Sequence, residues 1–502
     1  MPRPGSGMQS PMRIHLVGVS GTGMGALAGL LVELGHEVSG SDTAFEPPIG
    51  PELLAWGVEC KTGYEASHIT PALDLVVVGN VCRKDNPEVL AAQAQGLPLT
   101  HIAGALTRFA LPNTSPLVVA GTHGKTTTSS LCAWLLEQSG KAPGFLIGGL
   151  PGNFGRGFRS PKSDRKSLIR LAVRKTPMVL EGDEYDTAFF EKTAKFLHYQ
   201  AEVAIITSIE HDHIDIYPTD AEYIAAFAAF VRQIPETGLI VANANDPNVV
   251  RVVNEHARAP VSFYSLEGAP TYGAIAPWVA APVATDASGM SFDLFAGGVP
   301  AGRYAIPLSG THNLQNALAA LAATTQGFGC DLVTAARALS SFKGVRRRQE
   351  LVGEVGGVRI YDDFAHHPTA VRETLQALRA RHSAGRLIVL FEPRSATACR
   401  NLHQAAYAES FGAADIVLLA PLGRKGLPER EALNLGILRN ALESQGIQAL
   451  ACTSIDDVLE AALKLAAPGD SIAVLSNGAF GGIHGKLLAA LHQPTGHLAT
   501  GA

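Results

Sequence analysis

The sequence predicts an α/β protein of about three domains, each built on a parallel sheet with helices on both faces. Patterns typical of buried strands alternate with patterns typical of helices along the whole chain. The 502 residues are too many for one hydrophobic core, because domains usually hold roughly 100–200 residues. A hydrophobic content of 46%, a charged content of 17% and 52 glycines are typical of a loop-rich globular protein.

Composition and charge exclude several classes of protein. The formal net charge of −5 gives no general attraction to nucleic acid, and no apolar stretch is long enough to span a bilayer. Six scattered cysteines show neither a metal spacing nor a disulfide framework, so we expect a cytoplasmic protein. Residues 1–11 lack the apolar core of a secretory signal, and we expect a disordered extension, with Met8 or Met12 as possible starts.

Three units divide the chain, and we place them at 12–111, 112–342 and 343–502. The breaker-rich segment 111–116, which contains Pro112 and Pro116, predicts a hinge between the first two. Within the second unit, residues 269–302 are rich in Pro, Gly and Ala, which favours short strands or loops.

The first unit opens with a predicted strand, Arg13–Val17, and a glycine-rich turn that leads into a helix. Its spacing, from Gly18 through Gly21 and Gly23, is G-x-x-G-x-G, and such a turn binds anions at a helix N-terminus. Asp42, after the second strand, stands where a ribose-binding acid would. A nicotinamide cofactor is the rival interpretation, although dehydrogenases carry G-x-G-x-x-G.

The second unit opens with the strand Leu117–Ala120, followed by Gly121-Thr122-His123-Gly124-Lys125-Thr126-Thr127 and a helical pattern. Glycines let backbone N–H groups approach phosphate, lysine supplies positive charge, and a hydroxyl ligates Mg²⁺. The pattern predicts a nucleoside-triphosphate site, with Lys125 and Thr126 in the last two roles. Val119 stands where the longer motif has a glycine, and a glycine turn without a ligand is the alternative. Two phosphate turns favour a nucleotide-linked substrate bound beside ATP.

Acids and imidazoles follow two further strands of this unit. Glu181–Asp186 follows the strand Met178–Leu180, and Ile209–Asp215 follows Val203–Thr207. Both groups should lie at the carboxyl edge of the sheet, where α/β proteins bind ligands. Beside a triphosphate loop, they would suit Mg²⁺. His211 alone is as consistent with an ordinary structural histidine.

Later segments repeat this strand-end placement. A helix is expected to begin within Gly310–Asn316, and the polar residues there could simply cap that helix. The arginines Arg346–Arg348 stand at the next domain junction, where a guanidinium can bind phosphate. In the third unit, strands are expected at 358–361, 386–391, 415–419 and 471–475. Asp362–Pro368 follows the first of these strands and Glu392–Thr397 the second.

Taken together, these residues resemble the Mur ligases, the ATP-dependent amide-forming enzymes of peptidoglycan assembly, from Met12 to about Leu491. The resemblance rests on the phosphate loop, the Glu181 strand end, the Asp212-His213 pair, Gly310-Thr311-His312-Asn313 with Asn316, and Asp362-Asp363 with His366-His367-Pro368. It implies a Rossmann-like N-terminal domain, a central P-loop ATPase-type domain with a mostly parallel sheet, and a Rossmann-like C-terminal domain.

Within the family, Phe227 stands where ligases of later steps carry a carbamylated lysine, which points to the branch that acts on UDP-N-acetylmuramate itself. Segments 143–154, 185–199, 362–365 and 392–395 resemble the murein peptide ligases, which recycle the tripeptide L-alanyl-γ-D-glutamyl-meso-diaminopimelate. The N-terminal glycine turn and Ile209–Tyr217 resemble the alternative, the UDP-N-acetylmuramate–L-alanine ligases. Two features depart from the recycling pattern: a basic segment, 155–176, which we expect to be a solvated insertion, and Ala396, where Asn is common.

The resemblance also implies roles for particular residues. UDP-N-acetylmuramate would bind over Gly21, Thr22, Gly23, Met24 and Gly25, with Asp42 near the uridine. ATP would bind Gly121–Thr127, with Asn316 at the adenine, Arg348 at phosphate and Asp363 at the ribose. Thr126, Glu181 and His213 would hold Mg²⁺, and Lys125, Glu181 and His213 would be the catalytic set.

Arg394 would bind a carboxylate of the peptide, and either His366 or His367 is a candidate to accept the amine proton. Diaminopimelate and lysine are both compatible with the third peptide position, and oligomeric state stays open. The implied setting is peptidoglycan synthesis and recycling, and through them cell shape and division. A nucleotide-binding regulator without catalysis is the remaining alternative.

Overall fold

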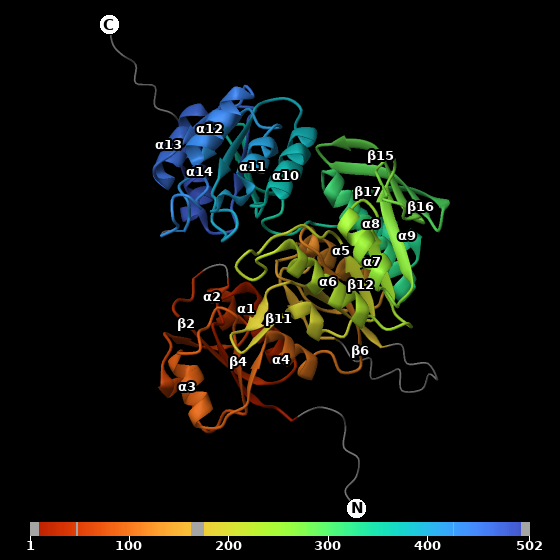
Figure 1. The fold of residues 1–502 in the computed structure, drawn as a ribbon, viewed down its shortest axis with the longest axis vertical. Helices are drawn as coiled ribbons and strands as arrows, with labels where there is room; N and C mark the ends of the chain where they lie inside the picture. Colours follow the sequence, from red (N-terminus) through yellow and green to blue (C-terminus); the bar gives the residue numbers. More distant parts are fainter. Residues whose placement is uncertain (1–9, 47–48, 162–174, 425, 493–502) are drawn as a thin grey trace, which may run out of the picture.

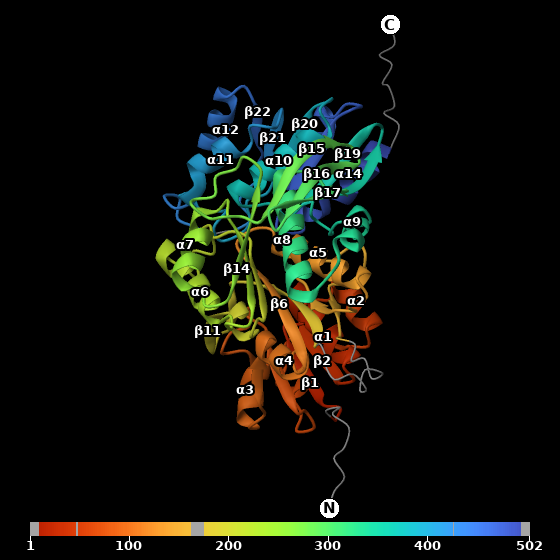
Figure 2. The ribbon, with the colours of Figure 1, turned by 90° about the vertical axis from the view of Figure 1, so that its right-hand side faces the viewer.

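The computed structural model describes residues 10–46, 49–161, 175–424 and 426–492. They form three lobes, with the N-terminal lobe at one end of the long axis and the C-terminal lobe at the other (Figures 1 and 2). The mixture of helices and mainly parallel sheets confirms the predicted α/β class.

The N-terminal lobe is a parallel sheet in the strand order β3-β2-β1-β4-β5. The first strand coincides with the predicted one, and Ile14, Leu16 and Val17 are fully buried in it. The elements are β1 (Arg13–Val17), α1 (Thr22–Glu33), β2 (Glu37–Asp42), α2 (Gly50–Ala55), β3 (Glu59–Thr62), η1 (Ala66–His68), β4 (Leu75–Val78), α3 (Pro87–Ala94), β5 (Leu99–His101) and α4 (Ile102–Phe109).

The central lobe is a mixed sheet in the order β17-β16-β15-β14-β13-β12-β6-β9-β7-β8, parallel from β15 to β7. Its elements are β6 (Thr114–Ala120), α5 (Lys125–Gln138), β7 (Gly144–Leu146), β8 (Phe158–Arg159), β9 (Thr176–Gly182), β10 (Asp186–Ala188), β11 (Glu191–Ala194), η3 (Lys195–His198), β12 (Val203–Ile206), α6 (Asp220–Gln233), β13 (Leu239–Asn243), α7 (Pro247–His256), β14 (Val261–Leu266), β15 (Trp278–Asp286), β16 (Gly289–Ala296), β17 (Val299–Ile306), α8 (Thr311–Phe328) and α9 (Leu332–Ser340).

Successive side chains of β6 enter different cores, as the period of a strand requires. Leu117 and Val119 belong to a buried cluster with α5 and α8, whereas Val118 and Ala120 belong to a second cluster with α6. Helices therefore cover both faces of the central sheet, and the phosphate loop is fixed at the end of a strand buried on both sides.

Two expectations for this lobe need correction. The segment 269–302 forms loops and strands and no helix, as predicted, but its antiparallel strands, β15 to β17, are longer than the short strands expected. Alternate burial of Phe292 and Leu294 anchors them to the core, which the small neighbouring residues conceal in the sequence. The expected hinge is shorter than 111–116, because Thr114–Pro116 already belongs to β6 and pairs with β9.

The C-terminal lobe has the strand order β18-β19-β23-β20-β21-β22, with β18 antiparallel to its neighbour and the other pairs parallel. Its elements are β18 (Glu350–Val355), β19 (Val358–Asp363), α10 (Pro368–Arg381), β20 (Leu387–Phe391), η4 (Asn401–His403), α11 (Gln404–Ser410), β21 (Ile416–Leu419), α12 (Leu435–Ser444), β22 (Gln448–Ala451), α13 (Ile455–Leu465), β23 (Ser471–Leu475), η5 (Phe480–Gly482) and α14 (Ile483–His492). The four strands expected here are present.

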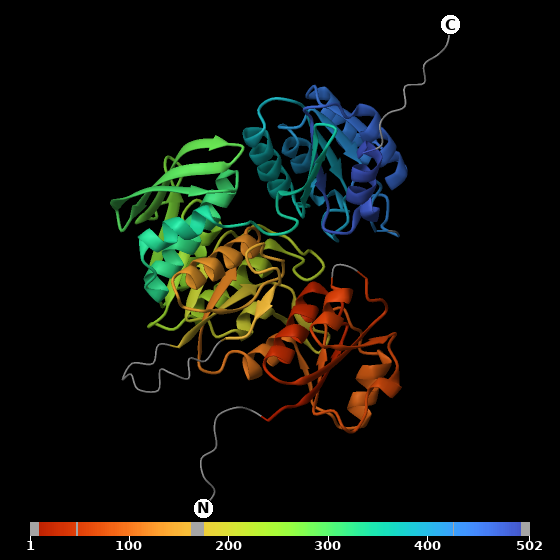
Figure 3. The same ribbon diagram turned by 180° about the vertical axis from the view of Figure 1, so that it is seen from behind.

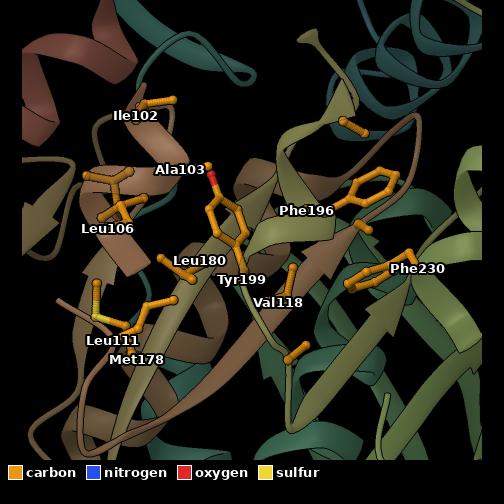
Figure 4. Packing of buried hydrophobic residues seen from close by; sticks show 14 of the residues in the cluster. Ile102, Ala103, Leu106, Leu111, Val118, Met178, Leu180, Phe196, Tyr199 and Phe230 are labelled. Atoms are coloured by element: carbon orange, nitrogen blue, oxygen red, sulfur yellow. The ribbon is translucent and has the colours of Figure 1, made fainter. Parts of the chain in front are cut away.

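The N-terminal and central lobes share one hydrophobic core (Figure 4). Ile102 and Leu106 of α4 belong to the same cluster as Leu180 of β9, and the ring of Tyr199 lies between the two lobes with its hydroxyl pointing toward Ala103. The C-terminal lobe has separate hydrophobic clusters of its own, and it is the blue lobe in Figure 3.

The basic segment 155–176 is described only at its two ends, and residues 162–174 lie outside the described part. At its start it is not a solvated loop. Phe158 is 1% exposed and packs against α1, where a Cβ on Gly29 would come within 2.2 Å of its ring. Arg156 pairs with Glu33 of α1, so this end of the segment joins the first two lobes.

Among the described helices, none combines the length and the apolar character needed to cross a bilayer. All six cysteines are free, as their spacing predicts.

Candidate active site

The phosphate loop has the strand, loop and helix geometry that the sequence predicts. Gly121 and Gly124 have φ of 139° and 79°, in the range that favours glycine. Both are also closely packed: a Cβ would come within 2.0 Å of Thr207 Oγ1 at Gly121, and within 2.3 Å of Asn316 Oδ1 at Gly124. Helix α5 begins at Lys125 directly after the loop, so its free N–H groups face the site.

The Lys125 ammonium group lies beneath this loop, where it donates hydrogen bonds to the carbonyls of Gly121 (2.6 Å) and Thr122 (3.1 Å). It also contacts the carboxylate of Glu184, at 2.9 Å from Oε2 and 3.1 Å from Oε1. His213 Nε2 lies 3.1 Å from the same Oε1. Glu184 therefore joins Lys125 to His213.

Glu184 is fully buried, and burial alone would favour its neutral form. The charges of Lys125 and His213 and their hydrogen bonds outweigh burial and lower the pKa of Glu184 to about 2. In return, Glu184 and Asp212 raise the pKa of His213 against the effect of burial. Sequence reasoning did not single out Glu184. Its signal is that a third acid, after Glu181 and Asp183, follows the end of β9.

The residues expected to hold Mg²⁺ divide into two neighbouring groups. Thr126 Oγ1 donates to Glu181 Oε1 (2.9 Å), and the N–H of Gly148 donates to Glu181 Oε2 (2.7 Å), whereas His213 lies on Glu184. Burial raises the pKa of Glu181, which means that the neighbouring cations and hydrogen-bond donors do not fully offset the cost of burying its negative charge.

These groups fit a hard divalent cation. Among the described residues, Glu184 Oε2 has no hydrogen-bond partner apart from its ion pair with Lys125. A hydroxyl, the buried carboxylate of Glu184, the partly buried carboxylate of Glu181 and an imidazole offer mostly oxygen ligands, which Mg²⁺ prefers.

His213 itself has a strained backbone, with φ of 54°. The N–H of His213 donates to the side chain of the preceding Asp212 (2.7 Å), and the ring of Tyr185 lies 4.1 Å from the His213 ring. These contacts hold the imidazole in the site.

Arg348 and Asp363 lie at the junction with the C-terminal lobe. Arg348 Nη2 is 3.4 Å from Thr126 Oγ1, so the guanidinium reaches the phosphate loop across the junction, and its contact with the phosphate of ATP stays a prediction. Asp363 ends β19 and accepts from the N–H groups of Gln349 (2.8 Å) and Ala365 (2.7 Å), which orders the linker between the lobes. Its contact with ribose stays a prediction. Arg347 instead holds the C-terminal lobe together, by donating to the carbonyls of Ser476 and Gly478.

Asn316 supports the phosphate loop from below. It is 5% exposed, and its Oδ1 accepts a hydrogen bond from Thr128 Oγ1 (3.1 Å). The predicted contact of Asn316 with adenine stays a prediction. In the structure, its side chain packs against Gly124.

The N-terminal glycine turn is only partly accessible. Gly21 precedes α1 and has open space where a Cβ would stand, and Thr22 is exposed, but Met24 and Gly25 are buried in the core. Asp42 accepts from the N–H groups of Ser20 (2.9 Å) and Thr43 (2.7 Å). Tyr64, which sequence reasoning missed, also donates to Asp42 (3.3 Å). An anion can therefore approach Gly21 to Gly23, while Asp42 fixes the turn.

Arg394 follows β20 and lies between two glycines of neighbouring strand ends. A Cβ on Gly423 or Gly478 would come within 2.8 or 2.4 Å of its side chain. The Arg394 side chain is 48% exposed, and Nη1 lies 4.0 Å from Glu392 Oε1. The guanidinium is thus accessible at the carboxyl edge of the C-terminal sheet, as a carboxylate-binding group would need.

Three family models match the chain. They are the Mur ligase family catalytic domain over residues 13–113, the Mur ligase middle domain over 119–324 and the Mur ligase glutamate ligase domain over 347–478.

Individual relatives match over almost the full length. UDP-N-acetylmuramate–L-alanyl-γ-D-glutamyl-meso-2,6-diaminoheptandioate ligase of Escherichia coli is 40% identical, over 95% of this chain and 98% of the relative. UDP-N-acetylmuramate–L-alanine ligase of a Roseiflexus species is 35% identical, over 93% and 96%. The crystal structure of a murein peptide ligase from Psychrobacter arcticus has a TM-score of 0.71 and 34% identity, over 96% of this chain and 99% of its own.

Proposed function

This chain belongs to the Mur ligase family, and we propose that it joins L-alanyl-γ-D-glutamyl-meso-diaminopimelate to UDP-N-acetylmuramate at the expense of ATP. The reaction forms an amide bond between the lactyl carboxylate of the sugar nucleotide and the amine of the tripeptide. Its place is peptidoglycan synthesis, as the recycling of a cell-wall peptide in the cytoplasm.

The observation that carries this proposal is a near-full-length likeness to tripeptide ligases together with the chemistry of the site. The relative at 40% identity is named for the tripeptide reaction, and the cationic side chains of Lys125 and Arg348 both contact the phosphate loop, at the Gly121 carbonyl and at Thr126 Oγ1. L-alanine ligases match at 35% identity, which makes L-alanine the alternative acceptor.

In the proposed first step, a lactyl carboxylate oxygen attacks the γ-phosphorus of ATP, and ADP leaves as the acyl phosphate forms. Lys125 and Arg348 neutralise the charge that shifts toward the bridging oxygen. The N-terminal turn at Gly21–Gly23 holds the pyrophosphate of the sugar nucleotide while this occurs.

In the second step, the amine nitrogen of the tripeptide attacks the acyl carbon, the bond from that carbon to the phosphate oxygen breaks, and the departing phosphate takes up the proton that the nitrogen loses. Arg394 binds a carboxylate of the tripeptide through its planar guanidinium. Thr126, Glu181, Glu184 and His213 would hold Mg²⁺, which supplies neutralisation of phosphate charge when bound.

The test is ADP release by the purified protein with Mg²⁺, ATP and UDP-N-acetylmuramate, comparing the tripeptide with L-alanine. We expect turnover with the tripeptide and little with L-alanine. Preference for L-alanine would assign the first step of peptidoglycan assembly instead, and ATP binding without turnover with either acceptor would favour a regulator.

A further inference from the structure

Three potential metal ligands meet between the phosphate loop and the C-terminal lobe, apart from the expected Mg²⁺ residues. His123 belongs to the loop, Glu210 follows β12, and His367 precedes α10 of the C-terminal lobe. One ligand atom from each lies within 4.8 Å of the others. Two imidazoles and one carboxylate form a set typical of zinc sites rather than magnesium sites.

His367 is the most informative member of this cluster. It is 4% exposed, and within the described part of the chain neither ring nitrogen has a hydrogen-bond partner. A buried imidazole without partners is costly, because it always carries a polar N–H group or a lone pair.

The distances suit a tetrahedral ion. Metal–nitrogen and metal–oxygen bonds of about 2.0–2.1 Å place neighbouring ligand atoms ~3.3 Å apart. Glu210 Oε2 lies 2.9 Å from His123 Nε2 and 3.9 Å from His367 Nδ1, on either side of that value. Thr369 Oγ1 donates to the other oxygen, Glu210 Oε1 (2.8 Å), in the way that neighbouring groups orient metal-binding carboxylates.

We propose that His123, Glu210 and His367 form a binding site for Zn²⁺ or a similar transition-metal ion. Because the ligands come from the central and C-terminal lobes, the bound ion joins the phosphate loop to the C-terminal lobe. A fourth position is left for water or for an anionic ligand.

A second cluster, His101, Glu191 and His198, has the same composition and serves as a control. There, His101 Nδ1 accepts the N–H of Gly104 (3.2 Å) as the cap of α4, so its proton must be on Nε2, which lies 2.9 Å from Glu191. Metal binding at Nε2 would require that proton to move to Nδ1 and would break the cap. This cluster is a hydrogen-bonded contact between lobes and not a metal site.

The experiment uses chelator-treated full-length protein titrated with Co²⁺ in excess Mg²⁺, which occupies oxygen-rich sites. Four-coordinate Co²⁺ absorbs strongly in the visible region, and we expect one equivalent to bind with this spectrum and to be displaced by Zn²⁺. His367→Gln should abolish the spectrum, and Thr369→Val should weaken binding by roughly tenfold.

The matched variant His198→Gln should bind Co²⁺ as the wild type does. Circular dichroism melting of each variant separates loss of ligand from loss of fold. Absence of a tetrahedral spectrum in the wild type, or its persistence in folded His367→Gln, would overturn the proposal. Neither readout depends on ligase activity.

Discussion

Glu184 is the residue on which the two cations of the phosphate site converge. Its carboxylate contacts both Lys125 and His213, in a place with no exposed surface. Removing the charge of a buried carboxylate that pairs with two cations is strongly destabilising, because both cations then lose their partner. The position of the loop lysine thus depends on a side chain that itself belongs to another strand end.

We predict that Glu184→Gln lowers kcat/KM for ADP release by about 10²–10³-fold, the range typical of groups that organise transition-state charge. The amide keeps the volume but not the charge. The neighbouring Asp183→Asn is the control, because Asp183 pairs with Lys195 (2.8 Å) outside the phosphate loop. Equal losses in the two variants would contradict a specific role for Glu184.

Arg394 leads to a prediction about peptide binding. Its guanidinium is half-exposed between Gly423 and Gly478. Arg394→Ala should raise the KM for the tripeptide at least tenfold, about 1.4 kcal/mol, while the KM for ATP changes little. Steady-state kinetics with each substrate varied in turn measures the difference. An unchanged tripeptide KM would remove Arg394 from the peptide site.

Glu88 gives a prediction about pH in the N-terminal lobe. This fully buried carboxylate accepts from Ser41 and His68 and contacts His15. Burial opposes ionisation, but hydrogen bonds from His15, Ser41 and His68 outweigh it and lower the pKa of Glu88 below 4.5. The depressed pKa stabilises the fold above about pH 4.5, and that contribution is lost as the pH falls through the folded-state pKa.

Glu88→Gln should therefore destabilise the protein by about 3 kcal/mol at pH 7, and the difference from wild type should shrink below pH 4.5. Urea unfolding of the wild type and the variant, at pH 7 and below pH 4.5, measures this difference in the free energy of unfolding. A difference that stays constant with pH would show that charge is not the cause.

The sequence located Lys125, Glu181 and His213 because each stands in a recognisable motif at a strand end. It did not locate Glu184 or Tyr64, since their importance comes from partners distant in the chain. The sequence also did not predict that backbone N–H groups donate hydrogen bonds to Asp363, because a motif shows side chains and not backbone contacts.

At the scale of elements, the two glycine turns differ in how much room they leave. Gly124, at φ of 79°, is pressed against Asn316, whereas Gly21 has no neighbour within 4 Å of an added Cβ. The loop at α5 is therefore rigid and closely supported, and the turn at α1 is open for a ligand.

We predict that Gly124→Ala weakens ATP binding strongly, because a Cβ is both strained there and in contact with Asn316 Oδ1 at 2.3 Å. Gly21→Ala should leave ATP binding intact and raise the KM for UDP-N-acetylmuramate, since its Cβ would occupy only ligand space. Isothermal titration with a non-hydrolysable ATP analogue tests the first variant. Wild-type ATP affinity in Gly124→Ala would contradict the loop assignment.

Element positions followed from the sequence where strands were apolar runs, as in β20 and in Ile472–Leu475 of β23. The antiparallel strands β15 to β17 were underestimated because one face of them is exposed, so that few of their residues are buried and the others include Pro, Gly, Ala and polar residues. The sequence did not predict which lobes share a hydrophobic core, because that depends on tertiary contacts such as Phe158 against Gly29.

At the scale of the molecule, the lobes are joined in two different ways. The N-terminal and central lobes share a continuous core, and Phe189, after β10, also packs against the N-terminal lobe. The C-terminal lobe contacts the central lobe mainly through polar groups, including Thr369 with Glu210 and Gln349 with His312. Closure over ATP and peptide should therefore be a movement of the C-terminal lobe alone, with the other two lobes moving as one body.

This difference predicts two unfolding transitions in calorimetry of the ligand-free protein, one for the C-terminal lobe and one for the fused pair. Leu390→Ala, in a core of the C-terminal lobe, should cost about 2–5 kcal/mol and lower one Tm by roughly 5–15 °C. Leu106→Ala, in the shared core, should lower only the other transition. A single transition that both variants shift equally would mean that the polar junction couples all three lobes. Separate shifts would mean that the junction opens at a cost small enough for substrate entry and product release to use it.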